Sequence, residues 1–77
     1  MSQQMREQVL LQLKKQGPGY VRDTTLAEIL RQSLKEVQDE LDNLEMRGLV
    51  QLSRAAGPAY YAVLTSKGME YIEDSDK

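Results

Sequence analysis

The chain has 77 residues, with 10 Lys or Arg, 12 Asp or Glu, no His and no Cys, and its formal net charge is −2. This length allows one domain with a small core, and the missing thiols and imidazoles remove the usual nucleophiles, general bases and metal ligands. Composition therefore argues against an enzyme and against a bound metal or other cofactor, and the acidic total argues against a domain-wide positive field for nucleic acid.

The first sixteen residues are predicted to form a helix. Apolar side chains recur every four positions at Met5, Val9 and Leu13, and the stretch that carries them contains no Gly or Pro. The Gly-Pro-Gly sequence at 17–19 ends this helix, because such a sequence strongly favours a turn. Residues 20–22 follow as a short extended segment.

Two further helices are each marked by the Ser/Thr-x-x-Glu spacing of a capping box. Thr25 and Glu28 are expected to cap a helix that opens at Asp23, and Ser33 and Glu36 are expected to cap the next helix. Both helices are amphipathic. Their expected apolar faces are Leu26, Ala27, Ile29 and Leu30 in the shorter helix, and Leu34, Val37, Leu41 and Leu44 in the longer one.

The apolar period changes from helical to alternating after Gly48, which is placed to end the third helix in a left-handed conformation. Alternation then predicts two strands, at 50–53 and 59–64, joined by a turn at 54–58. Together they form a β-hairpin.

A last short helix is expected to begin after the cap residue Thr65 and to end near Glu73. The single domain is therefore expected to span 1–73. Residues 74–77 are charged and have nothing to bury, so we expect a frayed tail.

The resulting order of elements describes a mainly α member of the α+β class, a winged helix-turn-helix. It has a three-helix core, a two-stranded wing plus a short strand, and a short C-terminal helix. The sequence TTLAEILRQSLKEVQDELDNLEMRGLV at 24–50 and the sequence YYAVLTSKG at 60–68 resemble small bacterial winged-helix regulators of the MarR and PadR kind. The resemblance implies a cytoplasmic DNA-binding regulator of transcription that works as a homodimer.

In that family the third helix enters the major groove, the wing touches the minor groove or the backbone, and the start of the second helix meets a phosphate. By matching positions, the resemblance implies a third helix at 34–47 and a wing at 54–58. It implies phosphate contacts from Thr24, Thr25 and Ser33, base contacts from Lys35, Gln38, Asp39 and Asp42, and a wing contact from Arg54.

The charge of the third helix departs from this family pattern. Residues 33–48 carry two basic and five acidic side chains, and the side opposite the apolar stripe bears Lys35 against Asp39 and Asp42. Carboxylates repel phosphates and weaken the salt-sensitive part of DNA affinity. Residues 1–35 carry six basic and three acidic groups (+3), whereas the remaining residues carry four and nine (−5).

This distribution supports an alternative function, a winged-helix protein–protein interaction module that does not bind DNA. The acidic face at Asp39, Asp42 and Met46 would then meet a basic or apolar protein partner. RNA binding is a poorer third reading, since the tyrosines are the only aromatic side chains.

Apolar side chains outside the predicted core suggest a second contact surface. Leu11 lies nearly opposite the apolar stripe of the first helix, and with Leu10 it is the candidate homodimer contact. Tyr60 and Tyr61 are adjacent, so a strand sends them to opposite faces. We expect one in the core and the other covering the hairpin.

The sequence predicts no contact with a membrane. Its first residues are polar, which is unlike a signal peptide. The longest apolar run, at 59–64, has six residues, whereas a membrane span needs about 20. Cytoplasmic localisation is therefore expected.

Overall fold

The computed structural model describes residues 2–17, 19–54 and 57–75, in which four helices and a small three-stranded antiparallel sheet form an α+β fold. The order of the elements is the predicted one. They are α1 (Ser2–Gln16), β1 (Val21–Arg22), α2 (Asp23–Leu30), α3 (Leu34–Met46), β2 (Val50–Ser53), β3 (Tyr61–Leu64) and α4 (Ser66–Ser75).

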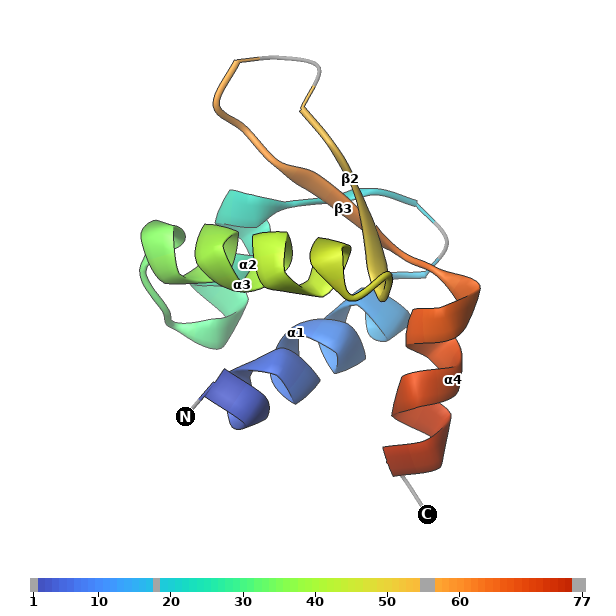
Figure 1. Ribbon diagram of the computed structural model, residues 1–77. Coiled ribbons are helices and arrows are strands. Elements are labelled where there is room, and N and C mark those ends of the chain that lie inside the picture. The colour runs from blue at the N-terminus through green and yellow to red at the C-terminus, as the bar shows by residue number, and fades with distance from the viewer. Residues whose placement is uncertain (1, 18, 55–56, 76–77) are drawn as a thin grey trace.

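The hairpin and α3 lie on one side of the molecule, and α1 lies beneath α3 (Figure 1). α1 contacts the other three helices and β3, so it is the central helix of the packing. α4 packs beside α1, and both ends of the chain lie on the side away from the hairpin (Figure 1).

The sheet has the order β1-β3-β2, so the last strand in the chain is the central one. Ala62 of β3 is paired with Val21 on one side and with Leu52 on the other. Gly48 adopts φ +79° between α3 and β2, as predicted for a left-handed helix end. The chain can therefore leave α3 and enter the hairpin within four residues.

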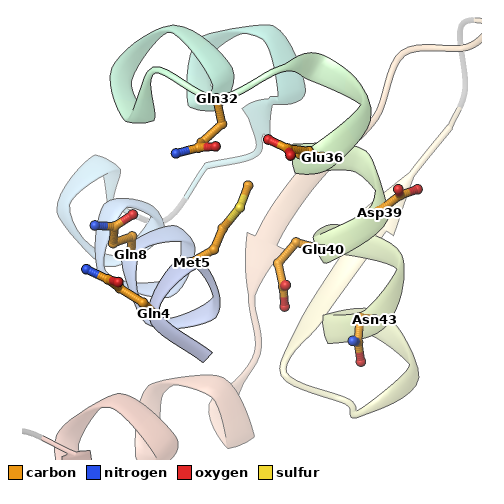
Figure 2. A pocket seen from close by; sticks show the side chains of 8 residues that line it. All are labelled: Gln4, Met5, Gln8, Gln32, Glu36, Asp39, Glu40 and Asn43. Carbon is orange, nitrogen blue, oxygen red and sulfur yellow. The ribbon is translucent and has the colours of Figure 1, made fainter. Parts of the chain in front are cut away.

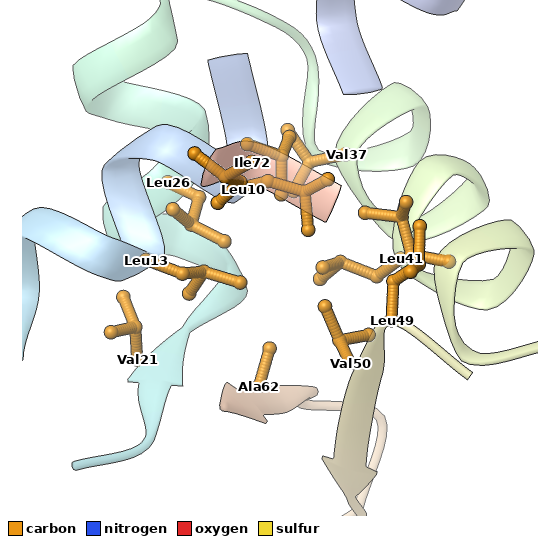
Figure 3. Packing of buried hydrophobic residues seen from close by; sticks show 12 residues of the cluster. Leu10, Leu13, Val21, Leu26, Val37, Leu41, Leu49, Val50, Ala62 and Ile72 are labelled. Atoms are coloured by element: carbon orange, nitrogen blue, oxygen red, sulfur yellow. The ribbon is translucent and has the colours of Figure 1, made fainter. Parts of the chain in front are cut away.

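The hydrophobic core lies between α1, α3 and the sheet (Figure 3). Leu26 from α2 and Ile72 from α4 also belong to it, and both are almost fully buried. The remaining buried members are Val9, Leu10, Leu13, Val21, Val37, Leu41, Leu44, Leu49, Val50 and Ala62.

Two of the three predicted N-cap residues, Ser33 and Thr65, are confirmed, but among the described residues the Glu36 side chain makes no return hydrogen bond to the Ser33 N–H that would complete a capping box. Ser33 Oγ accepts a hydrogen bond from the Glu36 N–H at 3.1 Å, and Thr65 Oγ1 accepts one from the Gly68 N–H at 3.0 Å. The predicted Thr25–Glu28 capping box is wrong, because α2 begins at Asp23 and Thr25 lies inside its first turn. The N-cap position belongs to Arg22, whose side chain makes no capping hydrogen bond.

Several element boundaries differ from the prediction. β3 begins at Tyr61 rather than 59, and α4 continues to Ser75, past the predicted end near Glu73. Parts of four predictions fall outside the described residues. These are Met1 of the first helix, Pro18 of the Gly-Pro-Gly turn, 55–56 of the hairpin turn, and 76–77 of the predicted tail.

Two residues predicted for apolar faces are exposed. Leu34 is 40% exposed because it is the first residue of α3, and a helical side chain leans toward the N-terminal end, which here is open. Ile29 is 44% exposed because it is turned about 100° from Leu30 around α2. Among the described helices, none has both the length and the apolar character that a membrane span requires.

Candidate nucleic-acid interface

α3 carries polar side chains on three sides, and its apolar side faces the core. One strip faces the hairpin, a second faces outward, and a third faces α1. The hairpin strip contains Gln38, Asp42 and Glu45, the outward strip contains Lys35, Asp39 and Met46, and the α1 strip contains Glu36, Glu40 and Asn43.

The outward strip is the part of α3 that is free to meet a large partner. The Lys35 and Asp39 side chains are 84% and 65% exposed, and they form an ion pair at 3.1 Å one helical turn apart. Such exposed pairs contribute little to stability, about 0.3–0.5 kcal/mol, so Lys35 can exchange Asp39 for another anion at low cost. Met46 is 87% exposed at the far end of the strip.

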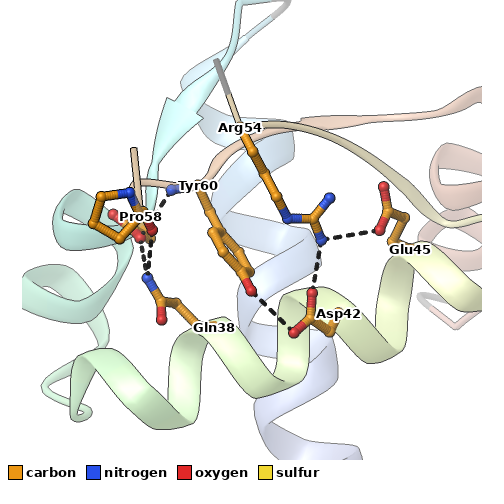
Figure 4. Close-up of polar contacts among 7 residues, drawn as sticks. Gln38, Asp42, Glu45, Arg54, Pro58 and Tyr60 are labelled. Atoms are coloured by element: carbon orange, nitrogen blue, oxygen red, sulfur yellow. Dashed lines mark hydrogen bonds and ion pairs between the residues drawn. The ribbon is translucent and has the colours of Figure 1, made fainter. Parts of the chain in front are cut away.

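Arg54 follows β2 at the turn end of the hairpin, and its side chain is held against α3 (Figure 4). Its Nη2 lies 2.8 Å from an Asp42 oxygen and 3.2 Å from a Glu45 oxygen, and its guanidinium sits 4.7 Å from the centre of the Tyr60 ring. Tyr60 Oη also donates to Asp42, at 3.1 Å. The contact with Tyr60, followed by those with Glu45 and Asp42, raises the pKa of Arg54 above its ordinary value.

Asp23 joins the start of α2 to both α3 and the hairpin. Its side chain is 1% exposed, and one oxygen accepts from Gln38 Nε2 at 2.7 Å and from the Tyr60 N–H at 3.0 Å. The other oxygen accepts from the Thr24 N–H at 2.7 Å and lies 3.7 Å from Arg22 Nε. This buried carboxylate therefore connects α3 to the hairpin.

Sequence reasoning misses this role of Asp23, because the sequence predicts only that this residue opens the second helix. The signal in the sequence is weak, because its partners Gln38 and Tyr60 lie 15 and 37 positions further along the chain. Glu45 was also missed as a partner of Arg54, since nine positions separate the two.

This arrangement places the four predicted base-contacting residues on two different strips of α3. Lys35 and Asp39 face outward, whereas Gln38 is turned toward the hairpin, where Nε2 also donates to the Pro58 carbonyl at 3.3 Å. Asp42 is occupied by Arg54 and Tyr60. The outward strip therefore offers one cation with one neighbouring carboxylate.

The predicted phosphate contacts do not form one cluster. Thr24 and Thr25 lie in the first turn of α2, and Ser33 follows its opposite end. A helix of this length spans about 12 Å, which separates the two groups. Thr25 and Ser33 are exposed, while Thr24 is half-buried and its N–H is taken by Asp23.

The predicted homodimer contact is wrong for Leu10, which is fully buried. Its part of α1 belongs to the core because α3, β3 and α4 all contact this helix. Leu11 is 41% exposed and remains open to a partner.

Both tyrosines are half-buried, so neither is the fully buried core residue that was predicted for one of them. Tyr60 packs against the core and reaches Asp42 of α3. Tyr61 lies beside Arg22, whose guanidinium is 5.9 Å from the ring centre.

Within the described ranges, no group of three or more His, Cys, Asp or Glu side chains is arranged to hold a metal ion. No protein-family model matches the chain, and no curated protein matches it.

Proposed function

We propose that the chain is a winged helix-turn-helix domain of the kind found in MarR- and PadR-type regulators, and that it binds double-stranded DNA. The observation that supports this function best is the exposed strip of α3 beside an anchored hairpin. Lys35 is exposed near the start of that strip and pairs only with Asp39 beside it, and Asp23 and Arg54 tie the hairpin to α3. A helix presented beside a hairpin is the shape with which winged-helix domains approach a duplex.

In this proposal the outward strip of α3 lies along the major groove. Lys35 exchanges its pairing with Asp39 for a phosphate or a base edge, and the exposed hydroxyls of Thr25 and Ser33 donate to backbone oxygens. Arg54 reaches the backbone only by releasing Asp42 or Glu45, because both carboxylates contact it in the free protein. Few cations and a cost of exchange together imply weak binding, and the salt dependence should be shallow because its slope scales with the number of phosphate contacts.

Fluorescence anisotropy of a labelled duplex of about 20 base pairs, measured at about 50 mM and about 200 mM salt, tests the proposal. Lys35→Ala should weaken binding and reduce the salt slope by about 1, as expected for one lost phosphate contact. Lys67→Ala is the matched control, since it removes the same charge from α4 and should bind as the wild type does. Absence of binding at the lower salt would overturn the proposal.

Asp39→Asn sharpens the test because it changes the opposite charge on the same strip. Removal of this carboxylate frees Lys35 and lowers the repulsion of phosphates, so DNA affinity should rise. Unchanged or weaker binding of Asp39→Asn would show that the outward strip of α3 does not face the duplex.

A second candidate function is that of a winged-helix protein–protein interaction module without DNA binding. It is favoured by the exposure of Met46 at 87% and by the Asp39 carboxylate on the same strip, which is 65% exposed. An apolar side chain with an acidic rim suits a partner that is basic at its edge and apolar at its centre. This function predicts that wild type and Asp39→Asn both fail to bind DNA even at low salt.

A further inference from the structure

An apolar groove lies between the second half of α1 and the end of α2. Leu30 is half-buried in it and packs against the core, whereas Leu11 and Ile29 are 41% and 44% exposed. The remaining lining residues are Gln8, Gln12, Lys14 and Lys15. All of these described lining residues belong to α1 and α2, so the groove is separate from the outward strip of α3 and from the hairpin.

Exposed apolar side chains come together in this groove. Among the described residues, five large hydrophobic side chains are exposed, and two of them, Leu11 and Ile29, line the groove. A single exposed apolar side chain is ordinary, but two that share a groove with a half-buried leucine form a patch that a partner can cover. A groove between two helices accepts the apolar face of a third helix.

The groove is cationic at one end. Lys14 and Lys15 lie three and four positions after Leu11, so the three side chains share one face of α1. In the described part of the chain, neither lysine forms an ion pair and the groove lining contains no carboxylate. Glu28 precedes Ile29 and is exposed, but it lies outside the lining. The lysines therefore give this groove a positive charge on a chain whose total is −2.

The neighbouring groove, between α1 and α3, has the opposite charge (Figure 2). Three carboxylates line it, and Gln8 of α1 belongs to both grooves. An acidic partner is repelled from the groove beside α3 and attracted to the one beside α2, so the charges restrict where on α1 it can lie.

We infer that the groove between α1 and α2 binds an acidic amphipathic helix of another protein. The apolar side chains of that helix cover Leu11, Ile29 and Leu30, and its carboxylates pair with Lys14 and Lys15. The apolar lining favours a protein over a nucleic acid, whose backbone offers charge but no apolar side chain. Two lysines are also fewer than the roughly 4–8 basic residues with which a protein segment recognises an anionic membrane. This surface is additional to the proposed DNA contacts and shares no residue with them.

NMR titration of the ¹⁵N-labelled full chain, without DNA and at constant ionic strength, tests the inference. The probe is a blocked peptide of about 14 residues, with leucines on one helical face and glutamates in the first turn, where they favour the helix. It should shift the amide signals of Leu11, Lys15 and Ile29. The same peptide with Gln in place of Glu should bind more weakly, and a peptide of the same composition without an apolar face should cause no shift.

Variants of the full chain locate the site. Lys15→Gln should weaken binding of the glutamate peptide about fivefold, as loss of one solvated charge at contact distance predicts. Ile29→Ala should weaken it about tenfold, because the peptide covers a side chain that is 44% exposed in the free protein. Lys67→Gln and Leu34→Ala are the matched controls, since they change exposed residues of the same kinds on α4 and α3, and both should bind as the wild type does.

Each of four results would overturn the inference. The first is a glutamate peptide that causes no shift or binds no better than its Gln counterpart. The second is wild-type peptide affinity in folded Lys15→Gln and Ile29→Ala variants. The third is binding of anionic lipid vesicles that both variants weaken, and the fourth is self-association in sedimentation that Ile29→Ala abolishes, because a second copy would then fill the groove. The titration contains no DNA, so its failure is separate from a failure of the proposed function.

Discussion

Replacement of Asp23 by Ala should destabilise the domain more than any other single loss of charge in the described network. Three hydrogen bonds, from the Thr24 and Tyr60 N–H groups and from Gln38 Nε2, end on this carboxylate. A hydrogen bond to a charged acceptor contributes about 1.5–3 kcal/mol, and a buried donor without a partner costs about 1–3 kcal/mol. Because these contributions overlap, we expect a total loss of about 3–5 kcal/mol.

That loss is large on the scale of the whole domain, since a chain of this length is stable by roughly 4–12 kcal/mol. Urea unfolding followed by circular dichroism measures it, provided that the slope with urea is unchanged. Asp23→Asn keeps the shape and one acceptor oxygen, so its loss should be smaller, about 1–3 kcal/mol.

Asp39→Asn is the matched control, because Asp39 is a 65% exposed acid whose partner Lys35 is also exposed. Its effect on the free energy of unfolding should stay below about 1 kcal/mol. The reasoning would be refuted if Asp23→Ala unfolded at the same urea concentration as Asp39→Asn, with the same slope.

Three other predictions concern packing, protonation and association. Gly68→Ala should lower the free energy of unfolding by about 1–3 kcal/mol in the same urea assay. A Cβ at this position would collide with the Leu49 carbonyl, which is backbone and cannot move aside. Wild-type stability of Gly68→Ala would contradict this packing. Burial, opposed by Arg6, raises the pKa of Glu40 above 4.5, so the folded state keeps this proton to a higher pH than the unfolded chain does. The free energy of unfolding should therefore fall as pH rises from about 4.5 through the raised pKa. The difference in this free energy between wild type and Glu40→Gln, measured over a series of pH values, should show the same fall. A difference that does not change with pH would contradict the prediction. If the exposed Leu11 mediates a homodimer, the sedimentation coefficient of the wild type should rise with protein concentration, and that of Leu11→Glu should not. Identical monomeric behaviour of the two proteins would exclude this contact.

The order of the elements could be predicted because each has a local signal. Ser33 lies three residues before Glu36, and Gly48 follows the last turn of its helix, so both ends of α3 are marked by residues next to them in the chain. The helical and alternating periods then separate helices from strands. These signals need no knowledge of what packs against them.

The internal polar contacts could not be predicted in the same way, because their partners are distant in sequence. Gln38 and Asp42 look like exposed residues on the wheel of α3, yet the hairpin covers that strip and occupies both side chains. The sequence of α1 does not show that Leu10 is buried, because α4 and the other elements that pack on α1 lie far from it in the chain. Only the tertiary arrangement decides which polar residues are still free.

The position of β3 between β1 and β2 has a consequence for how the chain acquires its structure during synthesis. Val21 of β1 has no strand partner until Ala62 has been made, and Leu52 of β2 waits for the same residue. A ribosome that adds about 5–20 residues per second therefore holds a nascent chain whose helices can form but whose sheet cannot. Until β3 emerges, the core sides of α1 and α3 stay open to water, and a chaperone that recognises exposed leucines would find them in that interval.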